Sequence, residues 1–319
     1  MSMRRRLLSL LREDAFVSGE KLADILGVSR AAVWKQVTIL RKKGYIIDSV
    51  RNKGYRLVSK PDIPYPEEVM DSLHTRVVGR RIFHFKTLSS TNVFARKLIG
   101  DGVEEGTVVV ADTQYEGRGR MNRKWFSPEG GLWFSVVLYP NIPPHRAMLL
   151  TMAASVGVAE GIKHVTGIKL AIKWPNDLLT NEGKKICGIL TEIDAEIDRI
   201  NSAVVGIGIN VNNELPESLR NQATTLTQTI GSKISRVQIL RSIIKSFDEN
   251  YSKIIDGDPD FVHRKWRCFS NMLNCRIKVV DGTRIATGMV VDVDENGCLL
   301  LENTRGEILR IQNGDVKYL

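Results

Sequence analysis

A proline-rich stretch at residues 59–66 constrains the fold more than any other feature of this sequence. It contains Pro61, Pro64 and Pro66, and proline can neither continue a helix nor donate a backbone hydrogen bond. The charge of the chain also changes at this point. Residues 1–60 carry 14 Lys and Arg against 5 Asp and Glu, a net charge of +9 out of +10 for the whole chain. We therefore predict a linker that separates a small basic domain, residues 1–60, from the remainder.

The basic segment has the pattern of a winged helix-turn-helix. Ser18 and Ser29 each stand where a serine can cap the start of a helix, and Gly27 suits a left-handed helix end. Two helices around a short turn make a helix-turn-helix, and a hairpin after them makes the wing. The predicted helices cover 3–13, 18–26 and 30–43, and the hairpin turns at 50–54.

The third of these helices has an apolar face and an opposite face that is basic and polar. A small domain with concentrated positive charge attracts polyanions, so this face and the wing are predicted to bind DNA. The alternatives are a winged helix used only for protein contact, or one that is idle. The candidate DNA-binding residues are Arg30, Ala31, Trp34, Lys35 and Thr38 on the helix, with Arg51 and Lys53 on the wing.

The rest of the chain predicts an α+β fold with a mixed sheet, because strand patterns follow one another in pairs as well as alternating with helices. Two domains are expected, at 67–270 and 271–319. The last segment is divided by Asn-Gly and similar turn pairs, which indicates short hairpins and a small barrel. Apolar strand patterns occur at 81–86, 107–112, 132–139, 168–174, 186–193 and 203–209, and helix patterns at 91–99, 145–165 and 236–255.

Composition argues against several classes of protein. Four cysteines form no CxxC pair, and no histidine lies at zinc-finger spacing, so neither a metal site nor a disulfide framework is expected. No apolar run approaches the roughly 20 residues that a membrane span needs. The first residues have no signal-peptide pattern. Free thiols in the reducing cytoplasm are the expectation.

The densest group of candidate functional residues lies at 114–125, QYEGRGRMNRKW. It combines two glycines, whose backbone permits close approach to a ligand, with arginines that match phosphate and carboxylate oxygens. Neither the GxGxxG nor the P-loop spacing is present. The segment is either an anion-binding loop or an ordinary basic surface loop.

Four further segments have both a structural and a functional interpretation. SSTN at 89–92 is a helix cap or a polar ligand site, and KWPND at 173–177 is a β-turn or a carboxylate at a sheet rim. The lysines before Gly188 are solvated or face a ligand. Glycines inside the strand GIGIN, 206–210, allow tight packing or a bound ligand.

In this order, the segments resemble the signature series of the biotin–protein ligases. The matching motifs are S-T-N, Q-x-x-G-R-G-R-x-x-R-x-W, K-W-P-N-D, K-x-x-G-I-L and G-I-G-I-N, spread over about 120 residues. With the winged helix and the small barrel, the resemblance covers the whole chain and is to the bifunctional type that also represses biotin synthesis genes. It implies a class II synthetase-like central domain and an SH3-like C-terminal barrel. One departure is Asn122, where the family often has glycine.

The resemblance also implies roles for individual residues. Ser90, Thr91, Asn92 and Gln114 would contact the biotin ureido ring, and Trp125 would pack near adenine. Lys185, Arg118 and Asp177 would be catalytic, with Asp177 receiving the attacking lysine. The remaining expected ligand contacts are Gly117, Gly119, Arg120, Asn176, Gly188, Gly206, Gly208 and Asn210.

The implied reaction uses biotin, ATP and Mg²⁺ and transfers biotin to a lysine of a biotin carboxyl carrier protein. The implied regulation is dimerisation of the adenylate-bound protein on operator DNA. Three alternatives remain: a ligand-responsive regulator without ligase activity, a lipoate–protein ligase, and a biotin ligase with an idle DNA-binding domain.

Overall fold

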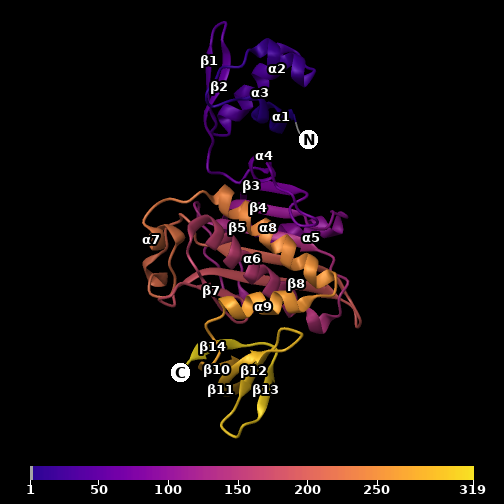
Figure 1. Cartoon of the computed structure of the whole chain (residues 1–319), viewed down its shortest axis with the longest axis vertical. Helices are drawn as coiled ribbons and strands as arrows, with labels where there is room; N and C mark the ends of the chain where they lie inside the picture. Colours follow the sequence, from indigo (N-terminus) through magenta and orange to yellow (C-terminus); the bar gives the residue numbers. More distant parts are fainter. Residues whose placement is uncertain (1–2) are drawn as a thin grey trace. The chain divides into compact units, whose positions relative to one another are not determined.

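A computed structural model describes residues 3–319 and divides the chain into two compact units (Figure 1). The first unit ends at Asp71 and the second comprises Ser72–Leu319. The proline-rich stretch therefore belongs to the first unit. The C-terminal strands share a unit with the central sheet.

The first unit contains the winged helix-turn-helix that the sequence predicts. Three helices precede a two-stranded antiparallel hairpin, and a short helix begins at Pro66, the last residue of the proline-rich stretch. The elements are α1 (Met3–Leu10), α2 (Gly19–Leu26), α3 (Arg30–Lys42), β1 (Ile46–Val50), β2 (Gly54–Ser59) and α4 (Pro66–Val69).

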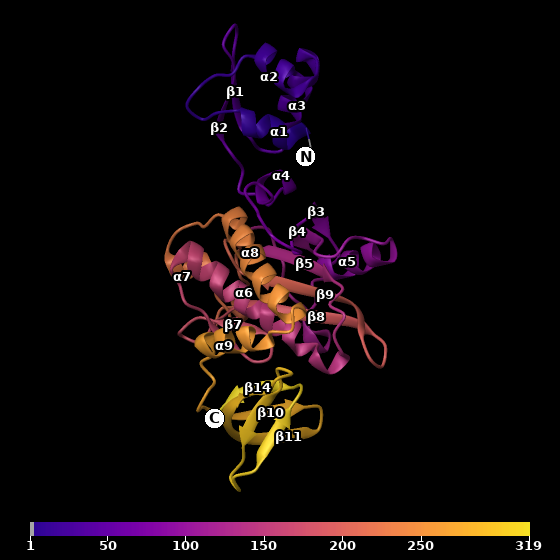
Figure 2. The ribbon, with the colours of Figure 1, turned by 45° about the vertical axis from the view of Figure 1, so that its right-hand side comes forward.

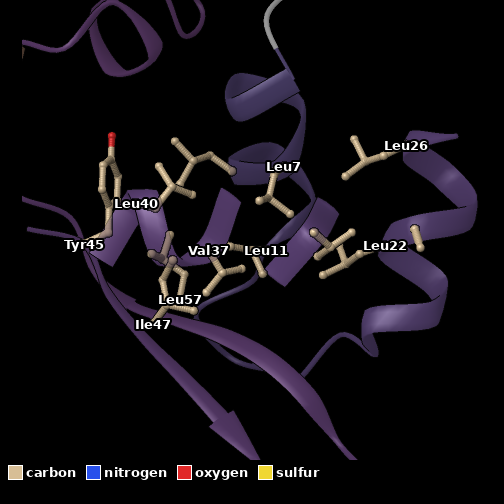
Figure 3. Packing of buried hydrophobic residues seen from close by; sticks show 12 residues of the cluster. Leu7, Leu11, Leu22, Leu26, Val37, Leu40, Tyr45, Ile47 and Leu57 are labelled. Atoms are coloured by element: carbon tan, nitrogen blue, oxygen red, sulfur yellow. The ribbon is translucent and has the colours of Figure 1, made fainter. Parts of the chain in front are cut away.

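The helix ends of this unit follow from capping. The Ser18 side chain accepts from the Lys21 amide at 3.1 Å, and that of Ser29 accepts from the Ala32 amide at 3.2 Å. Gly27 ends α2 with a φ of +67°. The apolar faces of the helices and the hairpin then form one core, which includes Tyr45 and the fully buried Leu7, Leu22, Leu40 and Leu57 (Figure 3).

The second unit is built on a seven-stranded mixed sheet. Its strand order is β3-β4-β5-β9-β8-β7-β6, and only β3 and β4 pair in parallel within it. The strands are β3 (Ile82–Leu88), β4 (Val108–Gln114), β5 (Leu132–Leu138), β6 (Ala171–Lys173), β7 (Asp177–Leu179), β8 (Lys185–Ala195) and β9 (Ile200–Ile209). The mixed pairing confirms the predicted α+β class.

Helices cover both faces of this sheet. Glu192 of β8 bonds to Asn92 of α5 (Thr91–Gly100), whereas the neighbouring Thr191 bonds to Thr151 of α6 (Met148–Thr166). Because successive strand residues point to opposite faces, α5 and α6 lie on different faces. On the α6 face, α6 packs closely along α8 (Arg236–Ile255), as Figure 2 shows.

The remaining helices were not all predicted. α9 (Pro259–Phe269) is absent from the sequence expectations, and so is the five-residue α7 (Leu226–Ile230). The 3₁₀ turns are η1 (Arg120–Asn122), η2 (Pro144–Arg146) and η3 (Glu217–Leu219). Within residues 3–319, no helix combines the length and apolarity that crossing a bilayer requires.

The C-terminal segment of the second unit forms a five-stranded antiparallel sheet, which we call the C-terminal sheet. Its strand order is β13-β12-β11-β10-β14. The strands are β10 (Arg276–Asp281), β11 (Arg284–Val293), β12 (Leu299–Glu302), β13 (Ile308–Ile311) and β14 (Asp315–Tyr318). The turn between β13 and β14 reaches the site described next.

Candidate functional site

A cavity of about 670 Å³ collects most of the residues that the sequence motifs predicted. It lies on the α5 face of the large sheet. Among its lining residues are the predicted Ser90, Thr91, Asn92, Gln114, Arg118, Gly119, Arg120, Trp125, Asn176, Asp177, Lys185, Gly188, Gly206, Gly208 and Asn210. Gly117 does not line it. A Cβ there would meet the Trp125 carbonyl at 2.3 Å, so Gly117 serves packing within the loop.

A buried polar cluster forms one end of the cavity. The Gln114 side-chain oxygen accepts from the Thr91 amide at 2.7 Å and from its hydroxyl at 3.1 Å. The Ser135 hydroxyl lies 2.6 Å from Asn92 Oδ1, and Asn92 Nδ2 donates to Glu192 at 2.7 Å. Since these groups orient one another, the start of α5 presents a fixed set of donors and acceptors.

Glycines of β8 and β9 form the floor. Gly188, Gly206 and Gly208 point to the same face, because Gly188 is the register partner of Gly208 and Gly206 lies two residues before it. A Cβ on Gly206 would meet Asn92 Oδ1 at 2.0 Å, and one on Gly208 would meet Trp125 Nε1 at 2.4 Å. The glycines are therefore required for close approach of side chains from the opposite wall.

Trp125 lies over this floor. Its ring meets Trp133 edge-on with centroids 6.5 Å apart, and the Lys185 ammonium lies 5.1 Å from its ring centroid. Its indole nitrogen is buried and has no hydrogen-bond partner among residues 3–319. An aromatic face, a cation and an unused donor thus meet at one point of the cavity.

The lysine and the carboxylate of the two short motifs are paired. Lys185 Nζ lies 2.6 Å from Asp177 Oδ1, at the start of β8 and of β7. Asn176 precedes Asp177, and its Nδ2 donates to the Ile189 carbonyl at 2.7 Å. These contacts fix the rim residues relative to the glycine floor.

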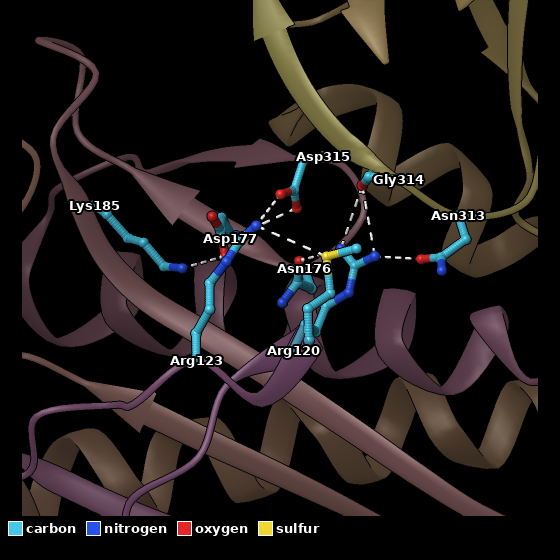
Figure 4. A network of polar contacts seen from close by, with 9 residues as sticks. Arg120, Arg123, Asn176, Asp177, Lys185, Asn313, Gly314 and Asp315 are labelled. Atoms are coloured by element: carbon cyan, nitrogen blue, oxygen red, sulfur yellow. Dashed lines mark hydrogen bonds and ion pairs between the residues drawn. The ribbon is translucent and has the colours of Figure 1, made fainter. Parts of the chain in front are cut away.

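The loop that follows β4 contributes the arginines (Figure 4). Arg120 is half-buried and donates to Asn176 Oδ1 at 3.2 Å, while Arg123 pairs with Asp315 of the C-terminal sheet. Burial lowers the pKa of Arg120, and the hydrogen bond to Asp315 raises that of Arg123. Arg118 is exposed and makes no ion pair within the described part of the chain.

A buried arginine contacts the chain on both sides of this loop, near the end of β4 and just before β5. Arg236, at the start of α8, donates to the Gly131 carbonyl at 3.2 Å, just before β5. It also lies 3.6 Å from Asp112, two residues before the end of β4, and His84 of β3 lies 3.2 Å from the same carboxylate. The loop therefore extends from a fixed base.

Several lining residues were not predicted as site residues. Arg123 and Lys173 lie inside recognised motifs, and burial lowers the pKa of Lys173. Asp315 is almost 200 positions from the loop. The segment after β9 contributes Leu215, Leu219, Asn221, Gln222 and Ala223. It is tied to β8 by the Lys185 amide, which donates to the Gln222 carbonyl at 2.8 Å.

The first unit presents a separate candidate surface for DNA. Arg30, Ala31 and Lys35 of α3 are exposed, and Trp34 is 60% exposed. Thr38 is partly buried, and its hydroxyl donates to the Trp34 carbonyl at 3.0 Å. The wing residues Arg51 and Lys53 are exposed. None of Arg30, Lys35, Arg51 and Lys53 forms an ion pair with any residue from 3 to 319.

Comparisons with known proteins agree with this arrangement. Residues 84–212 match the biotin/lipoate A/B protein ligase family, residues 4–56 an HTH domain, and residues 273–317 the biotin protein ligase C-terminal domain. The bifunctional ligase/repressor BirA of Bacillus subtilis is 41% identical over 99% of this chain and 98% of its own. The chain belongs to the bifunctional ligase/repressor family.

A second relative with the same name and a solved structure extend this result. BirA of Escherichia coli is 30% identical over 93% of this chain and 91% of its own. The biotin protein ligase from Aquifex aeolicus, solved with biotin and ATP, is 32% identical. It superposes with a TM-score of 0.65, and the match covers 75% of this chain and 99% of the Aquifex aeolicus chain. The family models therefore place a helix-turn-helix domain and a ligase domain in this one polypeptide.

Proposed function

We propose that this protein joins biotin to AMP at the expense of ATP, and then transfers biotin to a lysine of a biotin carboxyl carrier protein. The observation that supports this most strongly is the convergence of Arg120, Arg123 and Lys185 on one cavity with a glycine floor and a buried polar end. The polar end matches the amide-like edges of a ureido ring. The cations match the phosphate and carboxylate groups of an acyl-adenylate.

The first step activates a poor acyl donor. A carboxylate oxygen of biotin attacks the α-phosphorus of ATP, the bond to the β-phosphate oxygen breaks, and pyrophosphate leaves. Negative charge develops on the phosphorus oxygens, and preoriented cations stabilise it. Lys185 and Arg120 are suited to this task because protein contacts already fix their directions. Arg118, exposed in the same loop, is a further cation for the closed site.

In the second step a neutral lysine amine attacks the acyl carbon and AMP leaves. The amine must lose a proton before or during the attack. Asp177 lies at the rim of the cavity, where an incoming side chain would arrive, and its carboxylate is held by Lys185. We assign it the role of orienting the amine and accepting its proton.

Mg²⁺ is expected to accompany ATP. Residues 3–319 contain no group of three or more His, Cys, Asp or Glu side chains that would hold a metal ion. The carboxylates that line the cavity are Asp177 and Asp315. Both are paired with cations, Asp177 with Lys185 and Asp315 with Arg123. Mg²⁺ usually keeps several waters and binds through substrate phosphates, so it would be held mainly by the phosphates of ATP, whose charge it would neutralise.

Biotin-dependent exchange of labelled pyrophosphate into ATP tests the ligase assignment. The purified full chain is expected to catalyse exchange only when biotin is present, and then to label a carrier protein with biotin. A regulator without ligase activity would bind biotin but show no exchange. Exchange that depends on lipoate instead would support the lipoate ligase alternative.

We also propose that the first unit binds operator DNA and represses transcription. The supporting observation is the set of exposed cations on α3 and on the wing that form no ion pair with residues 3–319. Because a helix-turn-helix dimer reads two half-sites, we expect biotinoyl-AMP to promote dimerisation. Gel shifts with the chain's own upstream DNA, with and without biotin and ATP, test this. An unchanged affinity and sedimentation coefficient would contradict it.

A further inference from the structure

Glu192 of β8 does not line the cavity, but it bonds to Asn92, which does. One carboxylate oxygen accepts from Asn92 Nδ2 at 2.7 Å, and the other lies 3.3 Å from Nη1 of Arg96 in α5. The Leu190 carbonyl lies 3.4 Å from the same Asn92 nitrogen. Asn92 is only 4% exposed, so protein groups rather than solvent determine the orientation of its amide.

The chemistry of these neighbours decides which way the Asn92 amide points. A carboxylate and a backbone carbonyl only accept hydrogen bonds, so both require the NH2 group. The amide oxygen must then face the opposite way, where the Ser135 hydroxyl donates to it at 2.6 Å. A Cβ on Gly206 would meet this oxygen at 2.0 Å, so the oxygen lies against the glycine floor. An amide oxygen has two lone pairs, and the one that Ser135 leaves is available to a ligand.

Gln114, the second amide side chain at the polar end of the cavity, is also fixed in direction. Its Nε2 donates to the Ser127 hydroxyl at 2.9 Å, and its oxygen accepts from the Thr91 amide at 2.7 Å. Both amide nitrogens are thus turned toward protein acceptors. A ligand edge that donates N–H therefore fits this end better than one that only accepts. A ureido ring offers two N–H groups, whereas the dithiolane ring of lipoate offers none.

We propose that Glu192 is a positioning residue that sets the polarity of this end of the cavity and so selects a ligand ring that donates N–H. It acts through Asn92, because its carboxylate holds the amide with the oxygen toward the ligand. This inference rests on the proposed ligase function and deepens it, since it gives a physical reason for the choice of biotin over an acid whose ring has no N–H donor.

Glu192→Gln tests this because it keeps the shape of the side chain but adds a donor. Arg96 only donates, so it should draw the new amide oxygen outward and turn the new NH2 group toward Asn92. Either two NH2 groups then meet, or Asn92 turns and its oxygen meets the Leu190 carbonyl. Both arrangements weaken the contact with the ligand. Adding Arg96→Met lets the new side chain turn its oxygen to Asn92, so the double variant should recover the original polarity.

Calorimetric titration of the full chain with biotin measures the effect. Glu192→Gln should raise the Kd about three- to tenfold, the range for one hydrogen bond. The KM for biotin in pyrophosphate exchange should rise equally with kcat within about twofold, because the ring contact is the same in the ground and transition states. The double variant should come within about twofold of the wild type. Arg96→Met alone and Glu196→Gln, which removes an exposed carboxylate after β8, are the controls and should match the wild type.

Two biotin analogues probe the same point without substitution of the protein. In each, one ureido N–H is replaced by oxygen, which gives a cyclic carbamate. For the nitrogen that faces Asn92, two acceptors would meet, so that analogue should bind the wild type about ten- to hundredfold more weakly than biotin. The ratio of the two affinities should fall in Glu192→Gln, because Asn92 is then free to turn its NH2 group to the ring.

Wild-type biotin affinity in Glu192→Gln would overturn the proposal. So would a double variant that binds no better than Glu192→Gln, because the loss would then come from packing and not from polarity. Equal affinities of the wild type for biotin and both carbamates would also contradict it, whatever the variants show. If the wild type binds biotin but catalyses no exchange, the proposed function fails, and the binding series still decides the role of Glu192.

Discussion

The two positively charged regions of this molecule differ in whether their cations form ion pairs within the protein. On α3 and the wing, Arg30, Lys35, Arg51 and Lys53 are exposed and have no ion-pair partner within residues 3–319. In the cavity, Lys185 is paired with Asp177 and Arg123 with Asp315. The difference matches the two expected ligands. A long polyanion is bound by releasing its counterions along a surface, whereas a small acyl-nucleotide needs cations in fixed directions.

This comparison predicts different responses to substitution. Charges that act independently on a surface should contribute additively and be sensitive to salt. Charges held in a shared network should respond strongly and non-additively, because each one orients the next.

Lys185→Ala should have the largest effect. Loss of a preoriented cation at developing charge typically costs about 10²- to 10³-fold in rate, and it also leaves Asp177 without its partner. Stability should change by less than about 1 kcal/mol, because the pair is partly exposed. Pyrophosphate exchange and urea denaturation measure the two quantities. Lys184→Ala, which removes an exposed neighbouring cation, is the control. Turnover near the wild-type value in Lys185→Ala would contradict the assigned role.

Gly206→Ala should weaken biotin binding by about tenfold or more and destabilise the fold by about 1–3 kcal/mol, the cost of overpacking. The added Cβ would lie 2.0 Å from Asn92 Oδ1 and displace a side chain that Ser135 and Glu192 hold. Calorimetric titration with biotin measures the first effect. Gly100→Ala in α5 is the control, since a Cβ there meets nothing within 4 Å. An unchanged biotin affinity would exclude Asn92 from the binding site.

The same contrast explains what the sequence could predict. The winged helix follows from local signals, namely two serine caps, a glycine helix end and a basic turn, and all of them act within a few residues. The cavity motifs were recognised as separate segments. Their order along the chain suggested one site, and the pairing of β5, β8 and β9 brings them together.

The parts of the site that were missed share a physical cause. Asp315 carries no local signal, because an Asp after Asn-Gly is typical of a hairpin turn, and only tertiary contact gives it Arg123 as a partner. The segment 215–223 is similar, because its place beside Lys185 depends on backbone bonds to β8.

The double variant Arg51→Ala with Lys53→Ala tests the unpaired cations of the wing. Each lost phosphate contact should reduce the slope of log affinity against log salt by about 0.9. The double variant should therefore lose nearly two units of slope, and the affinity should fall about tenfold at moderate salt. Titrations of labelled operator DNA at several salt concentrations measure both. Pyrophosphate exchange should stay at the wild-type rate, and its loss would show that the two units do not work separately.

Substitutions of Asn122 should have the smallest effect and show how much of the loop geometry depends on its backbone. Asn122 has a φ of +57°, and asparagine tolerates this left-handed region better than most residues. Asn122→Gly removes the remaining steric cost but gives the unfolded chain more freedom, so the free energy of unfolding should stay within about 1 kcal/mol. Asn122→Ala keeps the steric cost of the left-handed backbone but loses the polar side chain. It should lower the free energy of unfolding by about 1 kcal/mol. Urea denaturation distinguishes the two variants. Equal stabilities would mean that the contacts of Arg120 and Arg123, rather than the backbone preference at Asn122, determine the shape of the loop.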